Sequence, residues 1–177
     1  MKTLIIDNGS SYINKLKRLL QAKVVKWNQL YKVNFNGYGL IVLSGGHKLP
    51  VMWHGPEFAN EIRIIKKIRK PIIGICLGSE LIAHAYGAKL FKLNRREHRT
   101  IKIIQNKQIF RVFESHRWAI KQLPKNFIAL ARSKDGIEIF RHKSRPIFGI
   151  QFHPEVLLTK TDGRKLLTNI LSGLGRK

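Results

Sequence analysis

Cysteine is almost absent from this sequence: Cys76 is the only one in 177 residues. One cysteine cannot form an intramolecular disulfide, and the cysteine and histidine residues show no zinc-site spacing. We therefore expect neither a disulfide nor a structural metal. Whatever chemistry Cys76 performs, it performs as a thiol.

Long hydrophobic runs are missing as well. The first ten residues hold one short apolar run, broken by Asp7, which is too short for a signal peptide and far short of the ~20 residues that span a bilayer. We expect a cytoplasmic protein with no membrane association. Since single domains usually have roughly 100–200 residues, we also expect residues 1–177 to form one domain without a linker.

Acidic residues are scarce: 10 Asp and Glu stand against 34 Lys and Arg, which gives a formal net charge of +24. Such a balance is typical of proteins that bind nucleic acid or another polyanion. The basic residues are, however, spread along the chain, with no basic tail and no nucleic-acid-binding signature. We favour a solvated basic surface, and an acidic partner remains the alternative.

The first half alternates short apolar runs with amphipathic stretches. Strands are predicted at 3–6, 22–27, 40–43 and 71–75, and helices at 10–21 (with Ser10 as its cap), 57–69 and 79–86. This alternation predicts an α/β fold whose mainly parallel central sheet is flanked by helices on both faces. The second half adds a smaller strand-rich part, with strands at 100–104, 108–113, 127–131, 137–141 and 147–152 and a last helix at 162–171.

Cys76 follows a buried strand and precedes a helix, with Gly74 and Gly78 two positions to either side. This spacing favours a nucleophile elbow, a sharp turn that exposes a side chain above the sheet. The helix N-terminus would favour the thiolate, and the Leu77 N–H would face a developing oxyanion. A buried cysteine in a glycine-flanked turn is the alternative.

The second motif is His153-Pro154-Glu155, directly after the last predicted strand. It places His153 at the carboxyl edge of the sheet, where Cys76 also lies. Glu155 is then within reach of the imidazole and fixes its tautomer, while the other ring nitrogen faces the thiol.

Three segments resemble the signatures of class I glutamine amidotransferases: Gly-Ile-Cys-Leu-Gly at 74–78, Ser-Gly-Gly at 44–46 and Gly-Ile-Gln-Phe-His-Pro-Glu at 149–155. The resemblance implies a catalytic triad of Cys76, His153 and Glu155. It also implies an oxyanion hole made by the backbone N–H groups of Gly46 and Leu77. No cofactor is required.

Within this family, Ser-Gly-Gly at 44–46 and the stretches Ser115-His116, Ala-Leu-Ala-Arg-Ser at 129–133 and Arg-His-Lys at 141–143 resemble the stand-alone glutaminase subunit of archaeal GMP synthetase. That resemblance implies that glutamine is hydrolysed through a cysteine thioester and that the ammonia passes to a separate ATP-dependent subunit, which aminates XMP. The synthetase half is absent from these 177 residues.

Some positions depart from the family pattern. Glu80 stands where the family usually has Gln to hold the substrate; its carboxylate would repel the carboxylate of glutamine and attract the ammonium. His116, Arg117 and Trp118 match a loop whose backbone contacts glutamine, although Trp118 replaces a common acidic residue. His47 and Lys48 follow the oxyanion glycine, where Pro is common.

Three other functions fit the sequence less well. They are a free-standing γ-glutamyl hydrolase with the same triad, the amidotransferase subunit of an anthranilate or aminodeoxychorismate synthase, and a non-catalytic basic protein that binds nucleic acid. The intact triad argues against the last of these.

Overall fold

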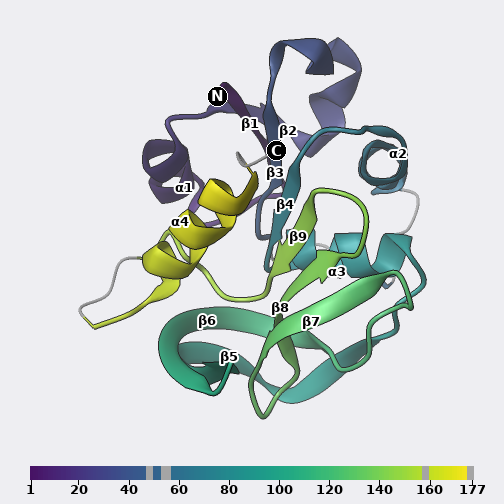
Figure 1. Cartoon of the computed structure of the whole chain (residues 1–177). Helices are drawn as coiled ribbons and strands as arrows, with labels where there is room; N and C mark the ends of the chain where they lie inside the picture. Colours follow the sequence, from purple (N-terminus) through teal and green to yellow (C-terminus); the bar gives the residue numbers. More distant parts are fainter. Residues whose placement is uncertain (47–49, 53–56, 157–159, 175–177) are drawn as a thin grey trace.

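The computed structural model describes residues 1–46, 50–52, 57–156 and 160–174. Their strands form one sheet in the order β2-β1-β3-β4-β9-β8-β7-β5-β6 (Figure 1). The first five strands in this order run parallel, and each later strand is antiparallel to its neighbour. The strands are β1 (Thr3–Asp7), β2 (Lys23–Lys26), β3 (Leu40–Leu43), β4 (Ile72–Ile75), β5 (Leu90–Gln105), β6 (Gln108–Ile120), β7 (Phe127–Arg132), β8 (Ile137–His142) and β9 (Ile147–Ile150).

Helices cover both faces of the parallel part. Figure 1 shows α1 and α4 on one side of the strands and α2 and α3 on the other. None of the described helices is long and apolar enough to cross a membrane. The helices are α1 (Ile13–Leu20), α2 (Ala59–Lys67), α3 (Leu77–Ala85) and α4 (Gly163–Leu174), with two short 3-10 helices, η1 (Trp27–Lys32) and η2 (Phe35–Gly37).

Two hydrophobic clusters fill the space between the sheet and these helix layers. Ile41 and Leu43 of β3 belong to the cluster under α2 and α3, whereas Leu40 and Val42 belong to the cluster under α1 and α4. A strand that is apolar on both faces suits the centre of a doubly covered sheet. The predicted α/β architecture is confirmed.

The helices begin one to three residues away from their predicted starts, and two of these differences bear on the site. The Ser10 cap is wrong, because α1 begins at Ile13 after Tyr12 and no side chain caps it; the Ser10 hydroxyl instead accepts the Tyr12 N–H at 3.1 Å in the turn before the helix. The helix after the cysteine begins at Leu77, not at Ser79. Cys76 is therefore the residue immediately before α3.

The largest difference is the length of β5 and β6, which span 16 and 13 residues. Sequence patterning predicts only their inner parts, because 90–99 is rich in charged residues and shows no alternation. These residues pair with the outer part of β6, with a register shift between Lys92 and Glu97, and Figure 1 shows that the two strands form one curled ribbon. The curl brings 115–118 next to the Cys76 turn.

Candidate functional site

Cys76 occupies a strained turn between β4 and α3. Its φ of 51° and ψ of −111° are rarely adopted by a residue with a side chain. The flanking glycines permit this turn: a Cβ on Gly74 would lie 2.4 Å from the Gly78 carbonyl oxygen, and a Cβ on Gly78 would lie 2.2 Å from that of Leu43. The predicted elbow geometry is present, and the cysteine side chain stands at the carboxyl end of the parallel strands.

His153 and Glu155 lie together beside this turn. The imidazole Nδ1 is 2.9 Å from the Glu155 carboxylate, and both side chains are buried. Because a carboxylate only accepts, Nδ1 carries the proton and Nε2 is left as the basic nitrogen. The Tyr12 ring packs edge-on against the imidazole at 4.9 Å. This packing and the hydrogen bond hold the ring in one orientation.

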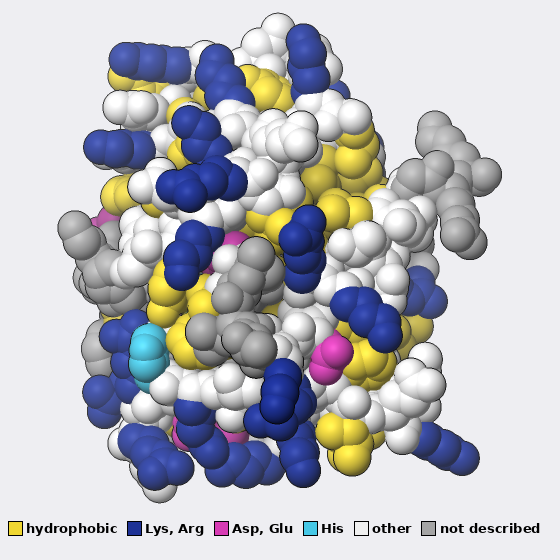
Figure 2. All heavy atoms as spheres, turned by 90° about the vertical axis from the view of Figure 1, so that its left-hand side faces the viewer, with side chains coloured by type: hydrophobic (Ala, Val, Ile, Leu, Met, Phe, Trp, Pro, Cys, Tyr) yellow, Lys and Arg dark blue, Asp and Glu magenta, His cyan; other side chains and the backbone are white. Residues whose placement is uncertain are grey.

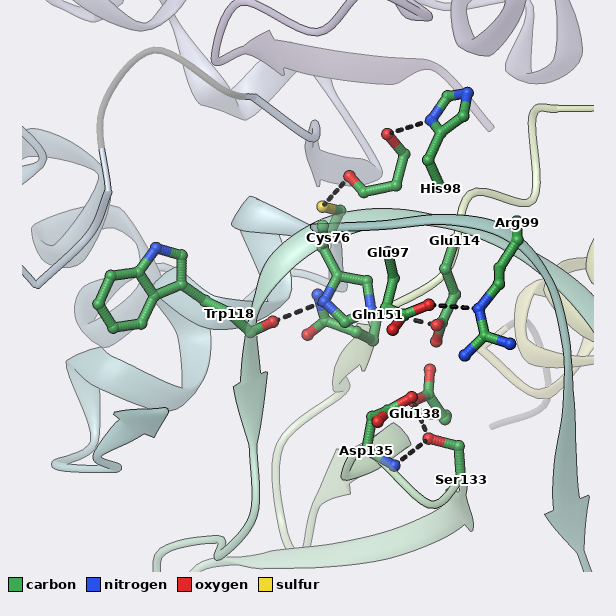
Figure 3. Close-up of polar contacts among 12 residues, drawn as sticks. Cys76, Glu97, His98, Arg99, Glu114, Trp118, Ser133, Asp135, Glu138 and Gln151 are labelled. Carbon is green, nitrogen blue, oxygen red and sulfur yellow. Dashed lines mark hydrogen bonds and ion pairs between the residues drawn. The ribbon is translucent and has the colours of Figure 1, made fainter. Parts of the chain in front are cut away.

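Gly45 separates the cysteine from the imidazole. A Cβ at Gly45 would lie 2.9 Å from His153 Cε1 and 3.5 Å from Cys76 Cβ, so the two side chains flank a position that only glycine fits. The thiol itself donates to the carbonyl oxygen of Ser115, with 3.9 Å between sulfur and oxygen (Figure 3). The chain thus brings thiol, imidazole and carboxylate together, with the thiol directed at Ser115.

A cavity of about 220 Å³ opens over Cys76. Seven of the nine residues that the sequence nominates line it: Gly46, Cys76, Leu77, Glu80, His116, Arg117 and Trp118. The other two, His153 and Glu155, do not, but His153 lines an adjoining cavity of about 260 Å³. Gly46, Arg96 and Ser115 line both cavities.

Three residues in this region were missed by sequence reasoning. Ser115 and Arg96 line the cavities, and Gln151 donates to the Glu80 carboxylate at 3.2 Å. Ser115 and Gln151 belong to segments that resemble the family. Arg96 lies in a charged stretch that reads as solvated surface, and its position depends on the curl of β5 and β6. His47, Lys48 and His54 lie outside the described residues.

The electrostatic environment of the thiol differs from the sequence expectation. Burial raises the pKa of Cys76 well above its ordinary value, and the carboxylates of Glu80, Glu155 and Glu114 raise it further. The backbone N–H of Leu77 lowers this pKa, as expected for a helix N-terminus, but its effect is smaller than that of burial. In this structure the thiol is therefore the favoured form.

Glu80 is a buried acid in the wall of the cavity. Burial raises the pKa of Glu80 to about 7, while the nearby His116 and the hydrogen bond from Gln151 lower it. Neutral and ionised forms are therefore both present near neutral pH. The carboxyl group of Glu80 therefore presents either no charge or a negative charge to the cavity, depending on pH.

His116 is buried beside a cluster of acidic side chains that includes Glu97, Glu114 and Glu138, which are labelled in Figure 3. Its Nδ1 is 2.7 Å from the Trp118 carbonyl oxygen, so this nitrogen donates, and its Nε2 is 3.3 Å from the Glu114 carboxyl group. The second contact is favourable only with a proton between the two groups. Burial raises the pKa of Glu114 to about 7, and burial beside Glu114 raises the pKa of Glu138 well above its ordinary value. Glu114 can therefore hold the proton that its contact with His116 requires.

Comparison with known proteins identifies the relatives of this chain. The family model "Glutamine amidotransferase class-I" matches residues 4–172. A glutamine-hydrolyzing GMP synthase subunit from Pyrococcus abyssi is 34% identical over 94% of this chain and 95% of its own length. The corresponding subunit from Methanocaldococcus jannaschii is 32% identical over 98% of each chain. A solved structure from Thermoplasma acidophilum, provisionally assigned as the same GMP synthase subunit, superposes with a TM-score of 0.85 at 27% identity, covering 98% of this chain and 94% of that one.

Proposed function

The chain belongs to the class I glutamine amidotransferase family, and from that premise we propose that it is the glutaminase subunit of a two-subunit GMP synthetase. It hydrolyses glutamine to glutamate and ammonia. A separate ATP-dependent subunit uses this ammonia to aminate XMP. The relatives named above are GMP synthase subunits matched over nearly their whole length, and the observation that carries the proposal is the cavity over Cys76, which is lined by seven of the nine residues that the sequence nominates.

In the first step of this mechanism the Cys76 sulfur attacks the side-chain carboxamide carbon of glutamine. The thiol proton passes to Nε2 of His153, and the Glu155 carboxylate stabilises the resulting imidazolium. The N–H groups of Gly46 and Leu77 stabilise the negative oxygen of the tetrahedral intermediate. The carbon–nitrogen bond then breaks, ammonia leaves with the proton from His153, and a glutamyl thioester remains.

In the second step water attacks the thioester. His153 accepts the proton from water, the carbon–sulfur bond breaks, and the proton returns to the sulfur as glutamate forms. The cavity of about 260 Å³ on the His153 side supplies a place for this water. No metal or organic cofactor takes part in either step.

The substrate itself supplies a reason for the thiol to ionise. Glu80 raises the pKa of Cys76, and the α-ammonium group of glutamine would offset the Glu80 charge when it enters the same cavity. Nucleophile and substrate are thus coupled through Glu80. Without glutamine in the cavity, burial and the Glu80 charge would keep Cys76 mainly as the less reactive thiol.

Two coarser features belong to the same proposal. All nine described strands form one sheet, which supports treating residues 1–177 as a single glutaminase domain. A reactive thiol must also stay reduced, which favours a cytoplasmic location.

The test is ammonia release from glutamine by the purified chain, alone and with the ATP-dependent subunit, ATP and XMP. We expect GMP to form only in the complete mixture. His153→Ala should reduce turnover nearly to background, while Glu155→Gln should retain part of it because a polar group still orients the imidazole. Full turnover by Glu155→Ala would contradict the assigned role of that carboxylate.

The γ-glutamyl hydrolase alternative is favoured by one observation, the acidic Glu80 in a position where the family usually has Gln. Assays with γ-glutamyl peptides and γ-glutamyl amines in place of glutamine separate the two functions. A higher kcat/KM for any such conjugate than for glutamine would support the alternative.

A further inference from the structure

Arg96 is an arginine without a carboxylate partner. Its neighbours Arg95 and Arg99 both pair with Glu97, whereas no ion pair involves Arg96 in the part of the chain that the structure describes. Its Nη2 donates to the Ser115 hydroxyl at 3.2 Å, and that hydroxyl is also 3.1 Å from Nδ1 of His98. Among the described residues, one neutral hydrogen bond therefore holds the guanidinium, and these residues leave most of its five N–H donors unused.

The position of Arg96 is at the junction of the two cavities of the site, since its side chain lines both. Ser115, which holds it, also accepts the Cys76 thiol through its carbonyl oxygen. The guanidinium is thus tied to the residue that touches the nucleophile. Arg117 lines the cavity as well, but within the described residues no side-chain hydrogen bond anchors it.

A charged substrate would meet groups of opposite sign in this cavity. Glu80 lies deep in its wall and is 3% exposed, whereas Arg96 is exposed at the rim. An α-amino acid carries one ammonium and one carboxylate on the same carbon, and a guanidinium binds a carboxylate through two parallel hydrogen bonds. The two side chains provide one partner for each charge.

We propose that Arg96 is a specificity-determining residue that binds the α-carboxylate of the substrate while Glu80 receives its α-ammonium. This inference rests on the proposed function and names what selects free glutamine. A glutamine whose α-carboxylate is amidated, or which is joined to another residue through that group, lacks the partner of Arg96. The site therefore accepts the free amino acid and rejects glutamine inside a peptide.

The experiment compares Arg96→Met with Arg95→Met, a matched control that removes the neighbouring guanidinium, using L-glutamine and L-glutamine α-amide as substrates with the ATP-dependent subunit present. For Arg96→Met we expect KM for glutamine to rise roughly 10–100-fold, the effect of losing a charge-assisted hydrogen-bond pair, with kcat little changed. The KM of Arg96→Lys should lie between those of wild type and Arg96→Met, because an ammonium group keeps the positive charge but cannot form the two parallel hydrogen bonds of a guanidinium. Arg95→Met should behave as wild type, and the α-amide should not distinguish wild type from Arg96→Met.

Three results would overturn the inference: an unchanged KM in Arg96→Met, an equal loss with the α-amide, or a fall in kcat alone. Calorimetry measures the Kd for glutamine of Cys76→Ala and of the double variant that also carries Arg96→Met. This comparison tests the same contact without turnover. Failure of the wild-type chain to hydrolyse glutamine would contradict the proposed function instead, and the calorimetric comparison would still decide the role of Arg96. Equal thermal unfolding of Arg96→Met and Arg95→Met checks that both variants fold.

Discussion

Cys76 shows how strongly a residue depends on its surroundings for reactivity. Its turn presents the side chain to a cavity, yet burial and three carboxylates oppose the thiolate. Only the Leu77 N–H acts in the other direction among the main influences on its pKa. Attack on glutamine therefore relies on transfer of the thiol proton to His153, and the α-ammonium group of glutamine would assist it by offsetting the Glu80 charge.

The first prediction concerns Cys76 itself. Cys76→Ala should abolish glutamine hydrolysis, because no other thiol exists in the chain to replace the nucleophile. A diazo ketone analogue of glutamine should label the wild-type protein once, at Cys76, as read by mass spectrometry of proteolytic fragments. Residual turnover of Cys76→Ala near the wild-type rate would contradict the thioester mechanism.

A second prediction tests the effect of Glu80 on the thiol in the absence of substrate. In Glu80→Gln a neutral amide replaces the nearby carboxylate, so the pKa of Cys76 should fall and iodoacetamide should alkylate it faster at a fixed pH. The increase should be several-fold, since about 1 kcal/mol of repulsion corresponds to roughly fivefold in thiolate fraction. The measurement is the alkylation rate from pH 6 to 10. Identical rate profiles for the two proteins would show that Glu80 does not influence the thiol.

At the scale of elements, α2 carries an acid into the core. Glu61 lies in its first turn and is 1% exposed, and among the described residues neither of its carboxylate oxygens has a hydrogen-bond partner of ordinary geometry. Burial raises the pKa of Glu61 to about 8, while the Asn8 side chain lowers it. Asn8 in turn donates to the Ser44 carbonyl at 3.2 Å, directly before Gly45. α2 is thus linked through a protonated carboxyl group to the strand end that borders the site.

The third prediction follows from this raised pKa. Between pH 4.5 and 8 the folded protein holds a proton on Glu61 that the unfolded chain has released, so stability falls as pH rises through this window. Glu61→Gln removes that dependence, and at pH 9 it should be more stable than wild type by a few kcal/mol, at about 1.4 kcal/mol per tenfold in proton affinity. At pH 4.5 the two proteins should be similar.

Urea unfolding of wild type and Glu61→Gln at a series of pH values measures this difference. If Glu61→Gln were less stable than wild type at every pH, the buried carboxyl group would be a net stabilising contact instead.

Elements also differ in how far the sequence predicts them. The buried strand Leu40–Leu43 has the predicted bounds, because four apolar residues between turns fit little else. The elbow and the His153 turn are predictable because glycine and proline act locally. The outer parts of β5 and β6 are not, since their charged residues gain stability from pairing across a curled ribbon. Arg96 reaches the site only through that curl, and no local pattern marks it.

At the scale of the whole molecule, most of the few acidic side chains are buried. Six of the ten are buried: Glu61, Glu80, Glu97, Glu114, Glu138 and Glu155. The face in Figure 2 accordingly shows many Lys and Arg side chains and few acidic ones. Because burial raises the pKa of Glu61, Glu80, Glu114 and Glu138, part of their formal negative charge is absent at pH 7. The net charge of the folded protein should therefore exceed the formal +24.

The last prediction concerns the effect of this charge on stability. A compact molecule concentrates its positive charges, so their repulsion destabilises the folded state more than the expanded chain. Salt shortens the range of that repulsion from about 30 Å at 0.01 M to about 8 Å at 0.15 M. We expect Tm to rise by several degrees over this interval, where about 1 kcal/mol corresponds to roughly 2–4 °C for a chain of this size. Calorimetry in sodium chloride, and in sodium sulfate at equal ionic strength, measures the effect. An equal rise of Tm in the two salts would mean general screening, whereas a much larger rise in sulfate would reveal a specific anion site. A Tm that does not change with salt would mean that the basic side chains are too far apart to destabilise the folded state.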